Sequence, residues 1–313
     1  MASPNLSEII TTTLRNRSKN LADNVTNHNA LLSRLNGKGN TNTVTGRQIV
    51  RELEYASNGT VGFYSGYETL DVSPSDVLTS ATFEYKQLAG NVTISGLEQI
   101  QNSGTEAVIN LLDSRIGVLE KTLMNTLSTS LYSDGTGTDG KEVGGLQLIV
   151  ADAGTGTVGG INSTTYSFWQ NAQTTASSSA FSTTNVQADM NTMYLNLVRG
   201  SDSPDLIMAD GNAYKSFLGS LQAIQRITSD SMAKSGFTSV AYLNSDVIYD
   251  DAAPTNKMYF LNTDYLRLET AANRNFVPGE AKMSVNQDAL VTPVFWSGNL
   301  SCSNRALQGV IHV

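Results

Sequence analysis

The chain has 313 residues, of which 40% are hydrophobic and 15% are charged, and its formal net charge is −8. Its single cysteine, Cys302, excludes an intramolecular disulfide and any cysteine-based metal cluster. The acidic charge and the lack of Lys/Arg runs argue against tight, direct nucleic-acid binding, which needs several basic side chains, and no stretch approaches the ~20 apolar residues of a membrane span. The first residues lack a continuous apolar core, so we expect synthesis in the cytosol without a secretory signal.

Residues 7–35 carry a thin apolar stripe that includes Leu14 and Leu21, and this pattern predicts a polar helix that ends near Gly37. So sparse a stripe gives an isolated helix little stability, and we expect the helix to dock on its own chain or on a neighbour. Removing residues 1–36 should then impair assembly more than folding.

Residues 58–96 read as strands without helices. The segment VLTSATFEYKQ (77–87) alternates apolar and polar residues, and GTVGFYSGYETL (59–70) is the expected partner strand of a long hairpin. Isolated two-stranded hairpins are marginal in water, so this one is expected to lie on another surface.

The strongest helix signal spans residues 104–132. A capping box at 103–106 precedes leucines spaced mostly by four and seven residues. A helix of about 28 residues would form a rod of roughly 40 Å. It could be a coiled coil, a core helix or a structural spine on which other elements lie.

Two glycine-rich matches to nucleotide-binding motifs follow this helix. GTGTDGK (135–141) has P-loop spacing, but it follows a helix, and Glu142 stands where a Ser or Thr should hold magnesium. GTGTVG (154–159) has the dinucleotide spacing after the strand-like run LQLIV (146–150). No convincing helix and no carboxylate about 20 residues on follow it. We therefore expect no bound nucleotide.

The remaining chain mixes helices and strands, so the fold class is α+β. One helix is predicted with Thr184 as its candidate N-cap and Gly200 at its end, and a second over 211–227. Strands are predicted over 205–209, 246–250, 257–262 and 265–269. The C-terminal stretch 289–313 reads as strand, turn at 297–299, and strand.

No catalytic constellation is found in the sequence. His28 and His312 lack partners at metal-ligand spacing, and adjacent carboxylates at Asp250 and Asp251 would point apart on a strand end. Cys302 lies in an expected strand, where a buried, inert thiol is favoured. We expect no enzyme activity, no cofactor and no metal.

Two stretches resemble the major capsid proteins of tailed bacteriophages. They are GGLQLIV…GTVGGINSTTYSFWQN (144–171), with its aromatic pair Phe168–Trp169, and FWSGNLSCSNRALQGVI (295–311). The order of predicted elements also agrees. The resemblance implies the Hong Kong 97-type shell fold: an N-terminal arm (1–57), an extended β-hairpin loop (58–96), a peripheral domain with a spine helix (97–143), an axial α/β domain (144–285) and return strands of the peripheral domain (286–313).

The same resemblance implies a structural protein that self-assembles into hexamers and pentamers of an icosahedral shell around packaged double-stranded DNA. Portal, scaffolding and decoration proteins would be its partners, DNA would be contacted weakly, and no membrane would be involved. The protein would be assembled in the host cytoplasm and reside in the virion. The alternatives are an encapsulin-type compartment shell, a nucleotide-binding enzyme that uses the glycine loops at 135–160, and a non-assembling binding module such as an adhesin.

The expected contacts between subunits lie on the arm, the loop and the aromatic pair. Lys86 is the only lysine in the loop and lies far from its expected tip near Pro74, so we expect no Lys–Asn cross-link of the kind some members of this fold form. The candidates are Leu14, Leu21, Phe63, Tyr64, Phe83, Tyr85, Lys86, Phe168 and Trp169.

Overall fold

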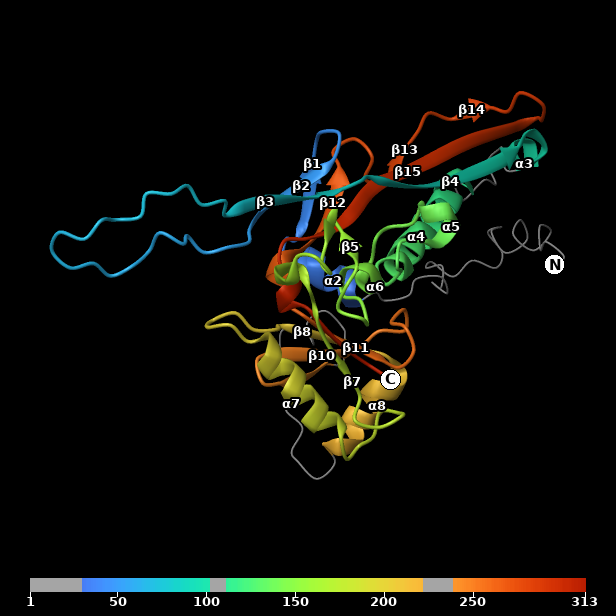
Figure 1. The fold of residues 1–313 in the computed structure, drawn as a ribbon. Helices are drawn as coiled ribbons and strands as arrows, with labels where there is room; N and C mark the ends of the chain where they lie inside the picture. Colours follow the sequence, from blue (N-terminus) through green and yellow to red (C-terminus); the bar gives the residue numbers. More distant parts are fainter. Residues whose placement is uncertain (1–29, 102–110, 222–238) are drawn as a thin grey trace.

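The computed structural model describes residues 30–101, 111–221 and 239–313. Two six-stranded sheets form the body, and one long loop protrudes from it (Figure 1). The predicted α+β class is confirmed. The capping box at 103–106 and residues Leu14 and Leu21 lie outside the described residues.

The first sheet is organised around one long strand, β15 (Ala289–Cys302), and we call it the β15 sheet. Strand β4 (Lys86–Ser95) runs antiparallel to β15 over ten residue pairs, from Lys86 opposite Gly298 to Ser95 opposite Ala289. The other strands of the sheet are β1 (Thr41–Val44), β12 (Leu266–Ala271), β13 (Val277–Pro278) and β14 (Lys282–Met283).

The spine helix α4 (Leu111–Ser130) packs on β4, and it lies within the predicted range 104–132. Leu123 and Leu127 are buried on its inner face. Gly90 of β4 lies so close to the helix that a Cβ there would come within 2.5 Å of the Leu119 side chain. A short helix, α3 (Gly96–Gln101), follows β4 at the far end of the molecule (Figure 1).

The second sheet, called the β11 sheet, has the order β7, β16, β11, β8, β10, β9. Apolar side chains alternate between its two faces: Ile207 and Ala209 of β8 pack under helices α7 and α8, whereas Leu206 and Met208 pack into the core shared with the β15 sheet. The elements are β7 (Ala172–Thr175), α7 (Val186–Leu197), β8 (Leu206–Ala209), α8 (Gly211–Ser220), β9 (Ser239–Tyr242), β10 (Ser245–Tyr249), β11 (Lys257–Leu261) and β16 (Gly309–His312).

Short elements connect the sheets. A two-stranded hairpin of β5 (Thr157–Val158) and β6 (Ile161–Asn162), called the glycine hairpin, lies at the centre of the molecule. The remaining pieces are α2 (Ala30–Gly37), α5 (Gly137–Gly140), α6 (Leu146–Ile149), η2 (Ser167–Trp169), η3 (Thr263–Tyr265) and η4 (Arg305–Leu307).

The long hairpin is built differently from the expectation. Strand β3 (Leu78–Phe83) pairs with β2 (Ile49–Glu54), not with residues 59–70. Ile49 and Leu53 are buried opposite Phe83 and Thr79, whereas the side chains of 61–70 are exposed. Burial of β2 therefore decides the pairing, and residues 55–77 form a loop without strands, which we call the protruding loop.

Three further expectations about local structure are wrong. LQLIV is a short helix, α6, and not a strand. Helix α7 is not capped by Thr184, because its N-cap residue is Asn185, which makes no side-chain cap bond. The expected turn at 297–299 is absent, because β15 continues without a break through these residues. Gly298 instead allows β15 to lie close to β12, since a Cβ there would lie 2.2 Å from the Glu269 carbonyl oxygen.

Sheet membership also crosses the expected domain boundaries. Strands β12 to β14, from the segment expected to be axial, pair in the β15 sheet, and β16 pairs in the β11 sheet. Helix α2, from the expected arm, buries Ala30, Leu31 and Leu35 completely. Removal of residues 30–36 would therefore take apolar side chains out of the core, and the expectation that loss of residues 1–36 impairs assembly more than folding stays a prediction.

Candidate assembly surfaces

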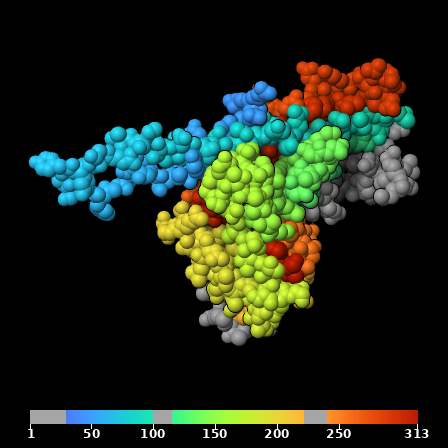
Figure 2. Space-filling view, viewed as in Figure 1, coloured from blue at the N-terminus to red at the C-terminus, as the bar shows by residue number. Residues whose placement is uncertain are grey.

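The protruding loop is the most exposed apolar part of the molecule, and it extends from the body as a thin arm (Figure 2). Phe63 and Tyr67 are fully exposed, and no other part of the described chain covers them. Monomeric soluble proteins rarely expose large contiguous apolar patches. The exposed apolar residues from 61 to 78 are Val61, Phe63, Tyr64, Tyr67, Leu70, Val72 and Leu78.

Local hydrogen bonds, rather than a core, shape this loop. Asn58 Oδ1 accepts from the Thr60 amide at 3.0 Å and from the Ser75 hydroxyl at 3.1 Å, which ties the two sides of the loop together. Hydrogen bonds from Ser73 hold the pKa of Asp71 below its usual range. The part of the loop from 58 to 75 is shaped by such local contacts, and its apolar side chains stay available to a partner.

A buried ion pair anchors the base of the protruding loop to the body. Arg51 of β2 pairs with Glu269 of β12, whose side chain is almost fully buried, and Arg51 Nε donates to Ser301 Oγ at 3.3 Å. Burial lowers the pKa of Arg51. These contacts fix the direction of the β2–β3 pair of strands on the β15 sheet. They could not be predicted from the sequence, because the partners are far apart in the chain.

The glycine hairpin also contacts the β2–β3 pair of strands, through β3. Gly159 and Gly160 form its turn, with φ values of 59° and 79°, and the Gly159 carbonyl accepts from the Thr82 amide at 2.9 Å. Trp169 Nε1 donates to the Val158 carbonyl at 3.0 Å, which fixes the hairpin to the core. The glycines that matched a dinucleotide motif thus have a structural role.

The P-loop match also has a local structural role. Thr138 and Asp139 have φ values of 51° and 57°, and the Thr138 hydroxyl donates to Glu142 Oε1 at 3.1 Å. The Glu142 carboxylate lies against Gly137, where a Cβ would meet it at 2.3 Å. A carboxylate in this position would repel a phosphate.

A buried arginine joins three segments behind the glycine hairpin. Arg305 is completely buried, and it donates to the Ile149 carbonyl at 2.6 Å, the Trp169 carbonyl at 2.9 Å and Asn171 Oδ1 at 2.9 Å. Burial lowers its pKa to about 10, so the guanidinium remains charged at neutral pH. The three acceptors satisfy a charge that would otherwise be costly to bury.

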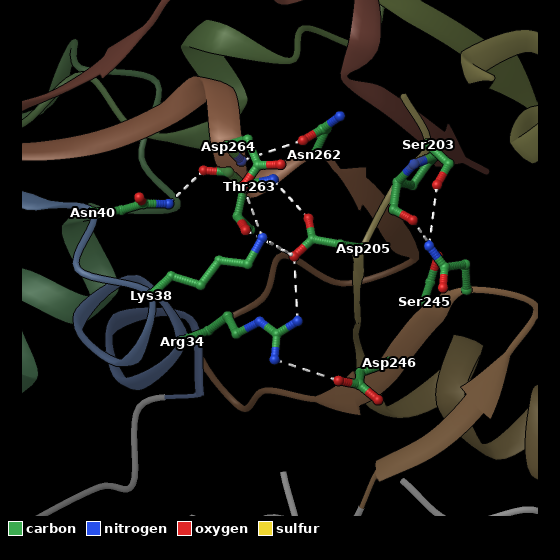
Figure 3. A network of polar contacts seen from close by, with 12 residues as sticks. Arg34, Lys38, Asn40, Ser203, Asp205, Ser245, Asp246, Asn262, Thr263 and Asp264 are labelled. Atoms are coloured by element: carbon green, nitrogen blue, oxygen red, sulfur yellow. Dashed lines mark hydrogen bonds and ion pairs between the residues drawn. The ribbon is translucent and has the colours of Figure 1, made fainter. Parts of the chain in front are cut away.

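Helix α2 is held between the two sheets by a network of charges (Figure 3). Arg34 contacts Asp205 at 3.2 Å and Asp246 at 3.4 Å, and Lys38 contacts Asp205 and Asp264 at 2.9 Å each. Burial opposes the charge of Asp205, but hydrogen bonds from Thr263 and Lys38 outweigh it and hold its pKa below the usual range.

The predicted contact residues have different environments. Phe63 and Tyr64 are exposed on the protruding loop, and Tyr85 and Phe168 are partly buried against the core. Phe83 and Trp169 are buried within the core of the same chain. Lys86 Nζ donates to the Gly140 carbonyl at 2.7 Å, on the body and away from the loop tip.

No protein-family model matches the chain, and no curated protein does. Solved shell structures match it over nearly its whole length. A chain of the cyanophage A-1(L) capsid asymmetric unit has a TM-score of 0.72 and 17% identity, covering 96% of each chain. The chain has the Hong Kong 97-type shell fold.

Two other matches show how widely this shell fold occurs. The capsid of the Myoviridae phage XM1 aligns with a TM-score of 0.61 and 12% identity over 100% of this chain and 98% of the other. The encapsulin of the holo-SrpI complex from Synechococcus elongatus PCC 7942 aligns with a TM-score of 0.61 and 9% identity over 100% and 95%. Identities this low establish the fold alone.

The candidate chemical groups of the sequence have the following surroundings in the described residues. In the part of the chain that the structure describes, no group of His, Cys, Asp and Glu could hold a metal ion, and no helix is long and apolar enough to cross a membrane. Burial raises the pKa of Cys302 to about 12, as expected of an inert thiol. Asp250 accepts from the buried Tyr132 hydroxyl at 2.9 Å, and Asp251 accepts from Tyr249, so the two carboxylates have separate partners.

Proposed function

We propose that the chain is a major capsid protein that assembles into hexamers and pentamers of an icosahedral shell around double-stranded DNA. The observation that carries this proposal is the protruding loop, whose fully exposed Phe63 and Tyr67 have no partner in the described chain. The likeness to capsid subunits supports it. A loop of this kind is stabilised when the surface of another copy covers it.

The shell's work is geometric, and burial of apolar area between subunits supplies the free energy of assembly. An acidic subunit suits an enclosure that must not hold DNA tightly, because tight binding needs many basic contacts. Assembly in the host cytoplasm, residence in the virion, and portal, scaffolding and decoration proteins as partners belong to the same proposal.

Light scattering and negative-stain microscopy of the purified full chain test this proposal. We expect shells, or rings of five or six subunits, alone or after addition of the scaffolding protein encoded with it. A strict monomer of 33.5 kDa under both conditions would contradict the proposal.

The second candidate is an encapsulin-type compartment shell, favoured by the full-length match to an encapsulin. The two shells differ in what they enclose. Shells purified after nuclease treatment would retain protected double-stranded DNA in the capsid case and a defined protein cargo in the compartment case.

A nucleotide-binding enzyme makes a different prediction. Under this alternative, ATP or NAD binds to the chain. Lys141→Ala or Gly156→Ala then abolishes that binding and leaves the mass of the particle unchanged. We expect no binding by calorimetry to either the full chain or its variants, because Glu142 opposes a phosphate at the first loop and Gly159 is engaged by Thr82 at the second.

A further inference from the structure

A cleft of about 480 Å³ opens between the base of the protruding loop and the glycine hairpin. Tyr55 and Asp76, from the two ends of the loop, line one side, and Tyr166 and Phe168, which follow β6, line the other. Thr82, Gly159 and Gly160, at the contact of β3 with the glycine hairpin, also line it. Its lining combines aromatic rings with a carboxylate.

Three aromatic rings line the cleft and pack against one another. The Phe168 ring lies at the centre, with its centroid 5.4 Å from that of Tyr55 and 6.4 Å from that of Tyr166, which it meets edge to face. Tyr166 is half exposed. Aromatic faces carry negative electrostatic potential, so the exposed ring of Tyr166 can attract an organic cation.

Asp76, which is exposed, lines the same cleft as these rings. Within the described residues it has no hydrogen-bond or ion-pair partner, whereas Glu68 and Asp71 of the same loop accept from Ser65 and Ser73. The stretch from residue 52 to 85 has no Lys, Arg or His, and Asp76 is the one charged residue among the described residues that line the cleft. The acidic residues of that stretch are Glu52, Glu54, Glu68, Asp71, Asp76 and Glu84.

We propose that this cleft receives an arginine or lysine side chain from the basic segment at residues 15–19 of a second copy of the chain. That segment, RNRSK, holds Arg15, Arg17 and Lys19 and is the densest group of cations in the sequence. Its charge is complementary to the cleft, and a guanidinium can both stack on the rings and pair with the Asp76 carboxylate. The choice of a second copy rests on the proposed function, since a shell brings copies together.

Disulfide trapping between copies tests the contact. Cys302 is buried, so an introduced exposed cysteine is the reactive one. Two full-length variants, Asp76→Cys and an affinity-tagged Arg17→Cys, are mixed under assembly conditions and oxidised. We expect a heterodimer with one chain of each kind on a non-reducing gel.

Asp251→Cys is the matched control, because Asp251 is also an exposed carboxylate but lies on the β11 sheet side of the molecule. It should give no heterodimer above background. Equal trapping at positions 76 and 251, or no trapping while the variants still assemble, would overturn the proposal. A link that forms only within one chain, when Arg17→Cys and Asp76→Cys are combined, would overturn the assignment to a second copy.

Peptide binding tests the chemistry of the cleft. A labelled peptide of residues 8–25 is titrated into the full chain, and Tyr166→Ala or Asp76→Asn should each weaken its binding about tenfold. Asp71→Asn removes the same charge from the same loop away from the cleft, and should change the affinity less than twofold. Equal losses for Asp71→Asn and Asp76→Asn would mean that only the overall charge matters, and the cleft proposal would fail.

The two proposals fail in distinguishable ways. Intact shells without the position 17–76 link leave the capsid proposal standing and reject the cleft. A strict monomer that nevertheless binds the peptide with the expected loss in Tyr166→Ala rejects the shell and the second copy, but keeps the cation-binding cleft.

Discussion

Arg305 shows how one side chain can determine the arrangement of a region. Its guanidinium makes three hydrogen bonds to acceptors around 149, 169 and 171, and all three acceptors lie in the interior. Arg305→Met should lower the free energy of unfolding by about 3–5 kcal/mol, because it leaves these acceptors unpaired. Urea denaturation followed by tryptophan fluorescence would measure it, since the nearby Trp169 is buried.

Arg267→Met is the control for that experiment. Arg267 also lies in the structured body, but its side chain is exposed on β12, and its loss should change stability by no more than about 0.5 kcal/mol. Similar effects of both substitutions would show that the contacts of Arg305 contribute nothing beyond removal of a charge.

The charges around α2 predict a dependence of stability on pH. The pKa of Asp205 is held below its usual range, so its stabilising charge is fully present above the unfolded value of about 3.9 and is lost as the pH falls through the folded value. The pKa of Lys38 is raised, because its pairing with Asp264 and Asp205 outweighs burial, so its contribution is lost only as the pH rises through that raised value. At neutral pH both contributions are present.

Asp205→Asn should therefore cost about 1–3 kcal/mol at pH 7, and the difference from the unchanged protein should shrink below about pH 4. Denaturation curves measured from pH 7 to 3 would test this. Asp264→Asn is the control, because that side chain is 73% exposed and should cost little at any pH. A pH-independent difference for Asp205→Asn would contradict the assigned ionisation.

At the scale of elements, the turn of the glycine hairpin sets the position of the β2–β3 pair of strands. A Cβ at Gly159 would lie 2.7 Å from the Ala81 Cβ, whereas one at Gly160 would meet nothing closer than 3.6 Å, and both residues have positive φ. Gly159→Ala should cost about 1–3 kcal/mol more than Gly160→Ala, because only it forces the hairpin away from β3.

Hydrogen exchange at the Thr82 amide would report that displacement, since this amide donates to the Gly159 carbonyl. Its exchange should quicken in Gly159→Ala and change little in Gly160→Ala. Equal exchange in the two variants would mean that the cost comes from the backbone conformation and not from the contact with Ala81.

The strands buried on both faces could be predicted because their pattern is local. β8 is fully buried, and β10, β11 and β12 are buried at most of their positions, so the predicted strands are confirmed. The predicted partner strand of β3 is wrong, because pairing depends on which strand can bury one of its faces. Ile49 and Leu53 of β2 are buried, and β2 lies outside the expected hairpin. Gly298 predicted a turn, but it serves close packing against β12, which only the tertiary structure reveals.

The candidate assembly surface could be predicted only in part. Exposed Phe63 and Tyr64 lie in a polar, glycine-rich segment, which is a local signal. The contacts that hold this region in place join residues far apart in the sequence. Arg51 forms an ion pair with Glu269, and Arg305 donates to the carbonyl of Ile149, 156 residues earlier in the chain. Phe83 and Trp169 show the converse, because a large aromatic residue near a surface motif can belong to the core.

At the scale of the whole molecule, apolar side chains are exposed at both ends. The protruding loop lies at one end, and Leu97, Ile100 and Val285 are exposed around α3 and β14 at the other (Figure 1). Different patches at opposite ends suit a heterologous, head-to-tail contact, which closes into rings when the rotation permits. This arrangement agrees with the proposed five- and six-membered capsomers and leaves folding of the subunit independent of the loop tip.

Substitution at the loop tip separates assembly from folding. Phe63→Ser combined with Tyr67→Ser removes two fully exposed rings that make no core contact, so unfolding in urea should change by less than about 0.5 kcal/mol. Assembly should be reduced at least about tenfold by light scattering, because each ring would bury its area only against another copy. Leu195→Ser, which removes an exposed apolar side chain from α7, should leave assembly unchanged. If the loop variant assembled normally, the rings would not be intersubunit anchors; if it lost stability as well, the tip would belong to the subunit's own fold.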